Sequence, residues 1–74
     1  MEEFKYDFTL LKERIRKIYG EFQKLAEDIG MSLISLSRKL NNHSYFRSNE
    51  VTLIADKLEI AFNDIPEYFY KLKE

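Results

Sequence analysis

The chain has 74 residues, one histidine, no cysteine and a formal net charge of −1. This length allows a single small domain near the lower limit for independent folding. Without cysteine there are no disulfides or thiolate metal sites, and a lone histidine cannot complete an ordinary zinc site. No apolar run is long enough to cross a bilayer, and the acidic start at Met1 has no signal-peptide pattern. We therefore expect one cytoplasmic domain over residues 1–74, with no metal or cofactor.

Charge is distributed unevenly along the chain. The near-neutral total argues against a nucleic-acid binder, for which a basic balance is expected. However, phosphate attraction is local, because salt screens charges over roughly 8 Å. No acidic residue lies between Ile29 and Asn49, whereas residues 48–74 carry three lysines and six acidic residues, a net charge of −3. The acid-free stretch is therefore the segment best suited to phosphate contact.

Apolar residues at helical spacing predict two helices before Gly30. The stripe of the first helix consists of Phe8, Leu11, Ile15 and Ile18. Gly20 follows it at a position where a left-handed residue commonly ends a helix. The stripe of the second helix consists of Phe22, Leu25, Ala26 and Ile29, with Glu21 near its start.

A third helix is expected from about Leu33 to Leu40, because Gly30 interrupts the preceding pattern and Ser32 can cap the helix after it. Leu36 and Leu40 should point inward. Asn41 and Asn42 tolerate the left-handed conformation needed at a helix end.

Two further helices are expected after the polar loop from His43 to Arg47. Ser48 is expected to cap the fourth, with Glu50 in its first turn and an end near Glu59. Its apolar stripe consists of Val51, Ile54, Ala55 and Leu58. The run Asn63-Asp64-Ile65-Pro66 is a start signal for a short fifth helix that continues through Phe69 and Leu72. No segment alternates as a strand would, so the sequence predicts an all-α fold.

The segment Leu25-Ala26-x-x-Ile29-Gly30-Met31-Ser32-x-x-x-Leu36-Ser37-x-x-Leu40-Asn41 resembles the helix-turn-helix of Cro-type and CI-type phage repressors. A small residue at Ala26 lets the two helices cross closely, and Gly30 can adopt the positive φ of a tight turn. The runs 7–11 and 64–69 are similar to short Gram-positive phage proteins described as Cro-like. The resemblance implies a five-helix, lambda-repressor-like domain with its helix-turn-helix at about residues 22–41.

By this resemblance, the third helix would enter the major groove of double-stranded DNA. The side chains expected to face base edges are Leu33, Ile34, Ser37 and Arg38. Arg38 could hold O6 and N7 of a guanine. The expected phosphate contacts are Ser32, Lys24, Lys39, Asn41, His43, Ser44 and Arg47. The implied function is a regulator that occupies phage operators as a Cro-like dimer.

Two aliphatic residues on this helix favour a second hypothesis. Leu33 and Ile34 stand where relatives usually carry polar, base-reading side chains, Lys39 stands at an often apolar position and Asn42 replaces a frequent glycine. An exposed apolar pair would suit a protein that binds a CI-type repressor and changes its operator binding. Some short phage regulators of this kind are described as modulators of repression. From the sequence, Leu33 and Ile34 face either DNA or a protein partner.

We expect no enzymatic activity and no small-molecule substrate. His43 and Ser44 are neighbours in sequence, which is not the spatial arrangement that a base and a nucleophile require, and no Gly-rich phosphate loop is present. The chain end is rich in aromatic residues, namely Phe62, Tyr68, Phe69 and Tyr70. A short chain cannot bury all of them, so we expect some in a dimer or partner interface and the others over the core.

Overall fold

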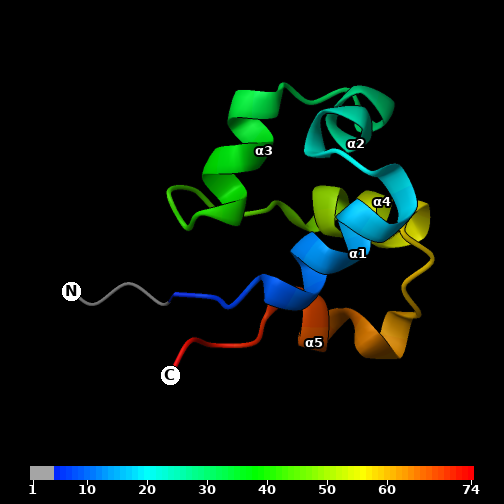
Figure 1. Ribbon diagram of the computed structural model, residues 1–74. Coiled ribbons are helices and arrows are strands. Elements are labelled where there is room, and N and C mark those ends of the chain that lie inside the picture. Colours follow the sequence, from blue (N-terminus) through cyan, green and yellow to red (C-terminus); the bar gives the residue numbers. More distant parts are fainter. Residues whose placement is uncertain (1–4) are drawn as a thin grey trace.

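The computed structural model describes residues 5–74 and is all-helical over that range, as expected (Figure 1). Its elements are α1 (Thr9–Tyr19), α2 (Phe22–Ile29), α3 (Leu33–Leu40), α4 (Ser48–Lys57), the short 3-10 helix η1 (Phe62–Asp64) and α5 (Ile65–Phe69). The only β-type pairing within residues 5–74 is an isolated antiparallel bridge between Tyr6 and Leu72. No helix in this range is both long enough and apolar enough to span a bilayer.

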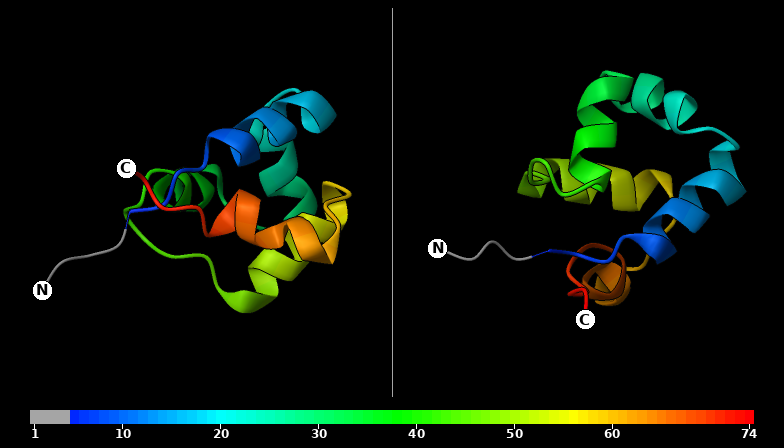
Figure 2. Two further views of the ribbon diagram at one scale, coloured as in Figure 1. Left: turned by 90° about the horizontal axis from the view of Figure 1, so that it is seen from below. Right: turned by 60° about the vertical axis from the view of Figure 1, so that its left-hand side comes forward.

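The helices surround one apolar core, with α3 and α5 at opposite ends of the molecule (Figure 1). Each α-helix contributes to that core; the largest fully buried side chains are Leu11, Ile15, Leu25, Leu36, Ile54, Leu58 and Phe69. The left view of Figure 2 shows that α4 and the η1–α5 segment run side by side in opposite directions. This arrangement determines which side of α3 faces outward, and it forms a second surface between α4 and α5.

Two predictions about burial are wrong. The sequence places Phe69 among the interface candidates, but it is only 2 % exposed because its ring packs edge-to-face on Phe46, with centroids 5.5 Å apart. The apolar period places Ile18 in the inward stripe of the first helix, but it is 38 % exposed, whereas its neighbour Tyr19 packs against the core.

The turn between α2 and α3 has the expected geometry. Gly30 has a φ of 73°, in the left-handed region that favours glycine, and the next residue's N–H donates to the Ala26 carbonyl at 2.8 Å. The Ser32 hydroxyl accepts a hydrogen bond from the Ser35 N–H at 3.0 Å, so it caps α3 as predicted. Asn42 has a φ of 63°, which confirms the expected left-handed residue after α3.

The predicted cap of the fourth helix is wrong by one residue. Ser48 is the first residue of α4 and Arg47 precedes it as the cap position. The Arg47 N–H donates to the Glu50 carboxylate at 2.8 Å, so a carboxylate in the first turn accepts from the N–H of the cap residue itself. The helix ends at Lys57, close to the expected Glu59.

The chain ends are held together and to the end of α3. Leu72 lies beyond α5, not within it as predicted, and its segment pairs with residues 5–7. The Asn42 side chain accepts from the Tyr6 N–H at 2.8 Å and donates to the Tyr6 carbonyl at 3.0 Å. The left-handed residue that ends α3 therefore also anchors the N-terminal segment.

A tyrosine–carboxylate contact joins α1 to α2 and predicts a change in the titration of the tyrosines. The Tyr19 hydroxyl donates to Asp28 at 2.5 Å, and this hydrogen bond, with burial and the nearby charge, raises the pKa of Tyr19 to about 12. Because the folded pKa is raised above the ordinary value of 10.0, this stabilisation is complete below pH 10 and is lost as the pH rises towards 12. In an ultraviolet titration of the folded protein, one of the five tyrosines should ionise last. Tyr19→Phe should remove that step, and a titration unchanged by Tyr19→Phe would contradict the assignment.

Candidate recognition face

The outward side of α3 carries all four side chains predicted to face base edges. Leu33 is 41 % exposed and Ile34 is 75 % exposed, whereas Leu36 and Leu40 on the opposite side are buried. Arg38 is exposed and Ser37 is half-buried. We call the surface formed by Leu33, Ile34, Ser37, Arg38 and Asn41 the α3 face. Two aliphatic side chains lie at its N-terminal end and one charged side chain lies near its centre.

A shallow groove adjoins the start of α3. It has a volume of about 370 Å³ and lies between the helix-turn-helix turn and the first turns of α4; its walls are Ile29, Gly30, Met31, Ser32, Ser35, Asn49, Glu50 and Leu53. Leu53 is 39 % exposed. Apolar side chains therefore continue from the turn onto α4, beside the helix end that carries Leu33.

Lys39 is not on the α3 face, which corrects its predicted role as a phosphate contact. Its ammonium group donates to both oxygens of Glu50, at 2.6 and 2.7 Å, and the two side chains are 11 % and 19 % exposed. Burial alone would raise the pKa of Glu50, but the hydrogen bonds from the Arg47 N–H and Lys39 hold it below its ordinary value. This pair ties α3 to α4 and neutralises one of the basic charges that the sequence assigned to DNA.

The other predicted phosphate contacts come from α2, from both ends of α3 and from the loop before α4. The exposed ones are Ser32, Lys24, Asn41, His43 and Arg47. The Asn41 side chain donates to the Ser37 hydroxyl at 3.3 Å. Ser44 is half-buried and contributes to the wall of an aromatic cavity.

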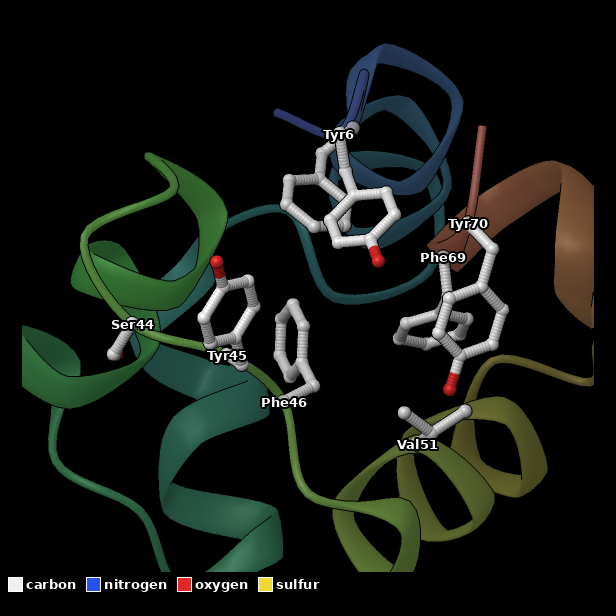
Figure 3. Close-up of a pocket in the computed structure, with 8 residues that line it drawn as sticks. Tyr6, Ser44, Tyr45, Phe46, Val51, Phe69 and Tyr70 are labelled. Atoms are coloured by element: carbon white, nitrogen blue, oxygen red, sulfur yellow. The ribbon is translucent and has the colours of Figure 1, made fainter. Parts of the chain in front are cut away.

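That aromatic cavity is a feature the sequence did not predict (Figure 3). It has a volume of about 160 Å³, and its walls are Tyr6, Phe8, Ser44, Tyr45, Phe46, Val51, Phe69 and Tyr70. The volume is close to that of about 150 Å³ which holds benzene in an engineered apolar cavity, and well below the roughly 300 Å³ of the smallest typical ligand pockets. It suits one ring or one branched side chain, not a metabolite. In the sequence, this cavity is indicated only by aromatic residues that lie close together along the chain, Tyr6 with Phe8 and Tyr45 with Phe46.

The aromatic end of the chain divides between core and surface. Phe62 is 85 % exposed and Tyr70 is 48 % exposed, so both remain candidates for an interface. Tyr68 is half-buried against the core. Among residues 5–74, no group of three potential carboxylate or histidine ligands is placed to hold a metal ion.

Comparison with known proteins agrees with this fold. Residues 4–72 match the model of a family described as a protein of unknown function (DUF739). Among solved structures, the chain is similar to the solution structure of the modulator of repression (MOR) of the temperate bacteriophage TP901-1 from Lactococcus lactis. The TM-score is 0.78, the sequence identity is 31 %, and the match covers 88 % of each chain. No curated protein sequence matches the chain. The similarity confirms the lambda-repressor-like helix-turn-helix fold and relates the chain to a phage regulatory protein.

Proposed function

Because the chain belongs to the DUF739 family and is similar to a phage modulator of repression, we propose that it binds a CI-type repressor and changes that repressor's affinity for operator DNA. The observation that carries this proposal is the exposure of Ile34, at 75 %, beside Leu33 on the α3 face. Exposed apolar patches mark interaction sites, whereas base edges are read mainly by side chains that form hydrogen bonds. The proposed site of action is the cytoplasm of a bacterial host.

The charge of the α3 face supports a protein partner. Lys39 is paired with Glu50, so Arg38 is the only charged side chain among the five residues of this face. Protein interfaces commonly combine a desolvated apolar centre with arginine and a polar rim. Leu33 and Ile34 would form the centre, and Arg38 with Asn41 the rim.

The proposal is tested by calorimetric titration of the full chain into a purified CI-type repressor. We expect saturable binding and co-elution of the two proteins in gel filtration. The heat capacity change should be negative, because apolar surface is buried. Absence of both heat and co-elution would contradict the proposal.

Direct operator binding is the second candidate, favoured by the basic residues around α3. Arg38 and Arg47 are exposed, and so is Ser32 at the start of α3, where the positive end of the helix dipole suits a phosphate. If this function holds, Arg38→Ala should weaken operator binding by about 1–3 kcal/mol, because a bidentate contact to guanine is lost. The measurement is fluorescence anisotropy with operator DNA at several salt concentrations.

Lys24→Ala is the matched control for that experiment, since Lys24 is exposed on α2 and is predicted to contact phosphate only. It should weaken binding to all sequences alike and make the salt dependence shallower. Binding that does not change with salt would exclude direct readout of the operator.

A further inference from the structure

The aromatic cavity is enclosed by segments that lie far apart in the sequence. Its walls come from the segment before α1, the loop between α3 and α4, the first turn of α4 and the end of α5. Phe8 and Phe69 each pack edge-to-face on Phe46, with centroids 5.5 Å apart, and Tyr6 packs in the same way on Tyr70 at 6.0 Å. These rings are packed against one another, yet they leave a space of about 160 Å³ between them.

The chemistry of the walls limits what can enter. No charged side chain lines the cavity, and all of the lining side chains except Ser44 are aromatic or aliphatic. Figure 3 shows the Tyr6 hydroxyl pointing towards the space between Phe46 and Phe69, with Val51 on the opposite side. A tyrosine hydroxyl can both donate and accept a hydrogen bond. The cavity is therefore an apolar space with one hydrogen-bonding group directed into it.

We propose that this cavity binds a small one-ring aromatic molecule that carries a hydroxyl group, that is, a simple phenol. An apolar cavity of about 150 Å³ holds benzene, so the space of about 160 Å³ fits one ring with one small substituent. The surrounding rings can pack edge-to-face on the bound ring as they do on one another. A charged ligand is excluded, because no side chain at the walls compensates for the loss of its hydration.

The hydroxyl of the ligand forms a hydrogen bond with the Tyr6 hydroxyl. Without such a partner, moving a phenol hydroxyl out of water opposes binding. Tyr6 is held in position because its N–H donates to the Asn42 side chain at 2.8 Å and its ring packs on Tyr70. The backbone contact thus directs the hydroxyl that distinguishes a phenol from a plain hydrocarbon ring.

A bound ring also stabilises the link between the N-terminal segment and the end of α3. It contacts Tyr6 on one side and Phe46 on the other, and the hydrogen bonds between Tyr6 and Asn42 join these two segments. A ligand stabilises the arrangement to which it binds, so the Tyr6 N–H should exchange with solvent more slowly when phenol is bound. This effect does not depend on whether the α3 face binds a repressor.

The test is titration of the ¹⁵N-labelled full chain with phenol up to about 20 mM, followed by nuclear magnetic resonance. A ligand of about seven heavy atoms binds weakly, so we expect saturable shift changes with a dissociation constant of roughly 1–5 mM. They should centre on Tyr6, Tyr45 and Phe46. Changes that do not saturate, or that centre on Phe62 and Ile65 in the groove between α4 and α5, would overturn the proposal.

Tyr6→Phe tests the hydrogen bond, with toluene as the matched ligand because it has the size of phenol but no hydroxyl. The substitution should weaken phenol binding about fivefold and leave toluene binding unchanged. It keeps the ring of Tyr6 and the backbone groups that bind Asn42, so the fold should be unaffected. Equal effects on the two ligands would contradict the role assigned to the hydroxyl.

Val51→Phe tests the location, because it places a ring from the chain itself in the cavity and should abolish phenol binding with an unchanged circular dichroism spectrum. Val51→Ile is the milder change for the case in which the phenylalanine variant does not fold, and it should weaken binding at least about threefold. Phe62→Ser is the control, since Phe62 is 85 % exposed and lies outside the cavity, and it should bind phenol as the wild type does. Unchanged affinity in Val51→Ile, or lost affinity in Phe62→Ser, would overturn the proposal.

Discussion

Lys39→Met is expected to lower the free energy of unfolding by about 2–4 kcal/mol. The substitution keeps the apolar stem but removes the ammonium that donates to both Glu50 oxygens at 2.6 and 2.7 Å. The Glu50 side chain is 19 % exposed, so its carboxylate would remain charged and largely out of water without its counter-charge. Urea unfolding followed by far-ultraviolet circular dichroism measures the change.

Two further variants separate the ion pair from general effects. In Lys39→Met with Glu50→Gln, the charge is gone and the amide oxygen can still accept from the Arg47 N–H, so most of the lost stability should return. Lys24→Met removes an exposed lysine and should change stability by less than about 0.5 kcal/mol. Equal losses in Lys24→Met and Lys39→Met would contradict this role of Lys39.

The same pair predicts the acid dependence of stability. The pKa of Glu50 is lower in the folded chain than its ordinary value of 4.5. The stabilisation is therefore complete above about pH 4.5 and is lost as the pH falls through the folded pKa. Asp7 and Asp28 also have lowered pKa values, so all variants should lose stability in acid. The difference in the free energy of unfolding between wild type and Lys39→Met should shrink below about pH 4.5, because protonation of Glu50 breaks the ion pair that only the wild type contains.

Replacing Leu33 and Ile34 together with serine should weaken binding of the proposed repressor by about 100-fold. The two side chains are 41 % and 75 % exposed, so the substitution removes the apolar centre of the α3 face and leaves the core intact. Titration calorimetry with the repressor measures the loss, and an unchanged thermal midpoint shows that the variant folds.

The chain offers a matched control on another helix. Leu10 and Ile18 on α1 are 39 % and 38 % exposed, so Leu10→Ser with Ile18→Ser removes two exposed aliphatic side chains at a distance from α3. This control should bind the repressor as the wild type does. If the control variant loses as much affinity as the α3 variant, the α3 face is not the docking site.

The helix-turn-helix could be predicted from the sequence because its determinants are local. Gly30 and the Ser32 cap are within three residues of the groups they affect, and α3 has the predicted bounds from Leu33 to Leu40. The position of Leu36 in the apolar period was enough to place it in the core. The outward position of Leu33, Ile34 and Arg38 follows from the same period.

The features that could not be predicted depend on contacts between distant segments. From the sequence, Lys39 is expected at the surface. In the structure, α4 places the Glu50 carboxylate 2.6 Å from the Lys39 ammonium. Asn42 is expected only to end a helix, but its side-chain amide also binds the backbone of Tyr6, 36 residues away. Arg14 likewise donates to the carbonyl of Leu58, 44 residues away. The burial of Phe69 and the aromatic cavity also require that residues 6–8, 44–46 and 69–70 meet, which no local pattern encodes.

The proposed role of the α3 face is tested by fluorescence anisotropy of operator DNA, measured with this protein alone, with the repressor alone and with both. If the α3 face binds the repressor, the protein alone should leave the anisotropy unchanged at physiological salt and should alter the repressor's binding curve. The Leu33→Ser, Ile34→Ser variant should have no such effect on the repressor. Tight, salt-dependent binding of operator DNA by this protein alone, lost in Arg38→Ala and retained in the serine variant, would contradict the claim.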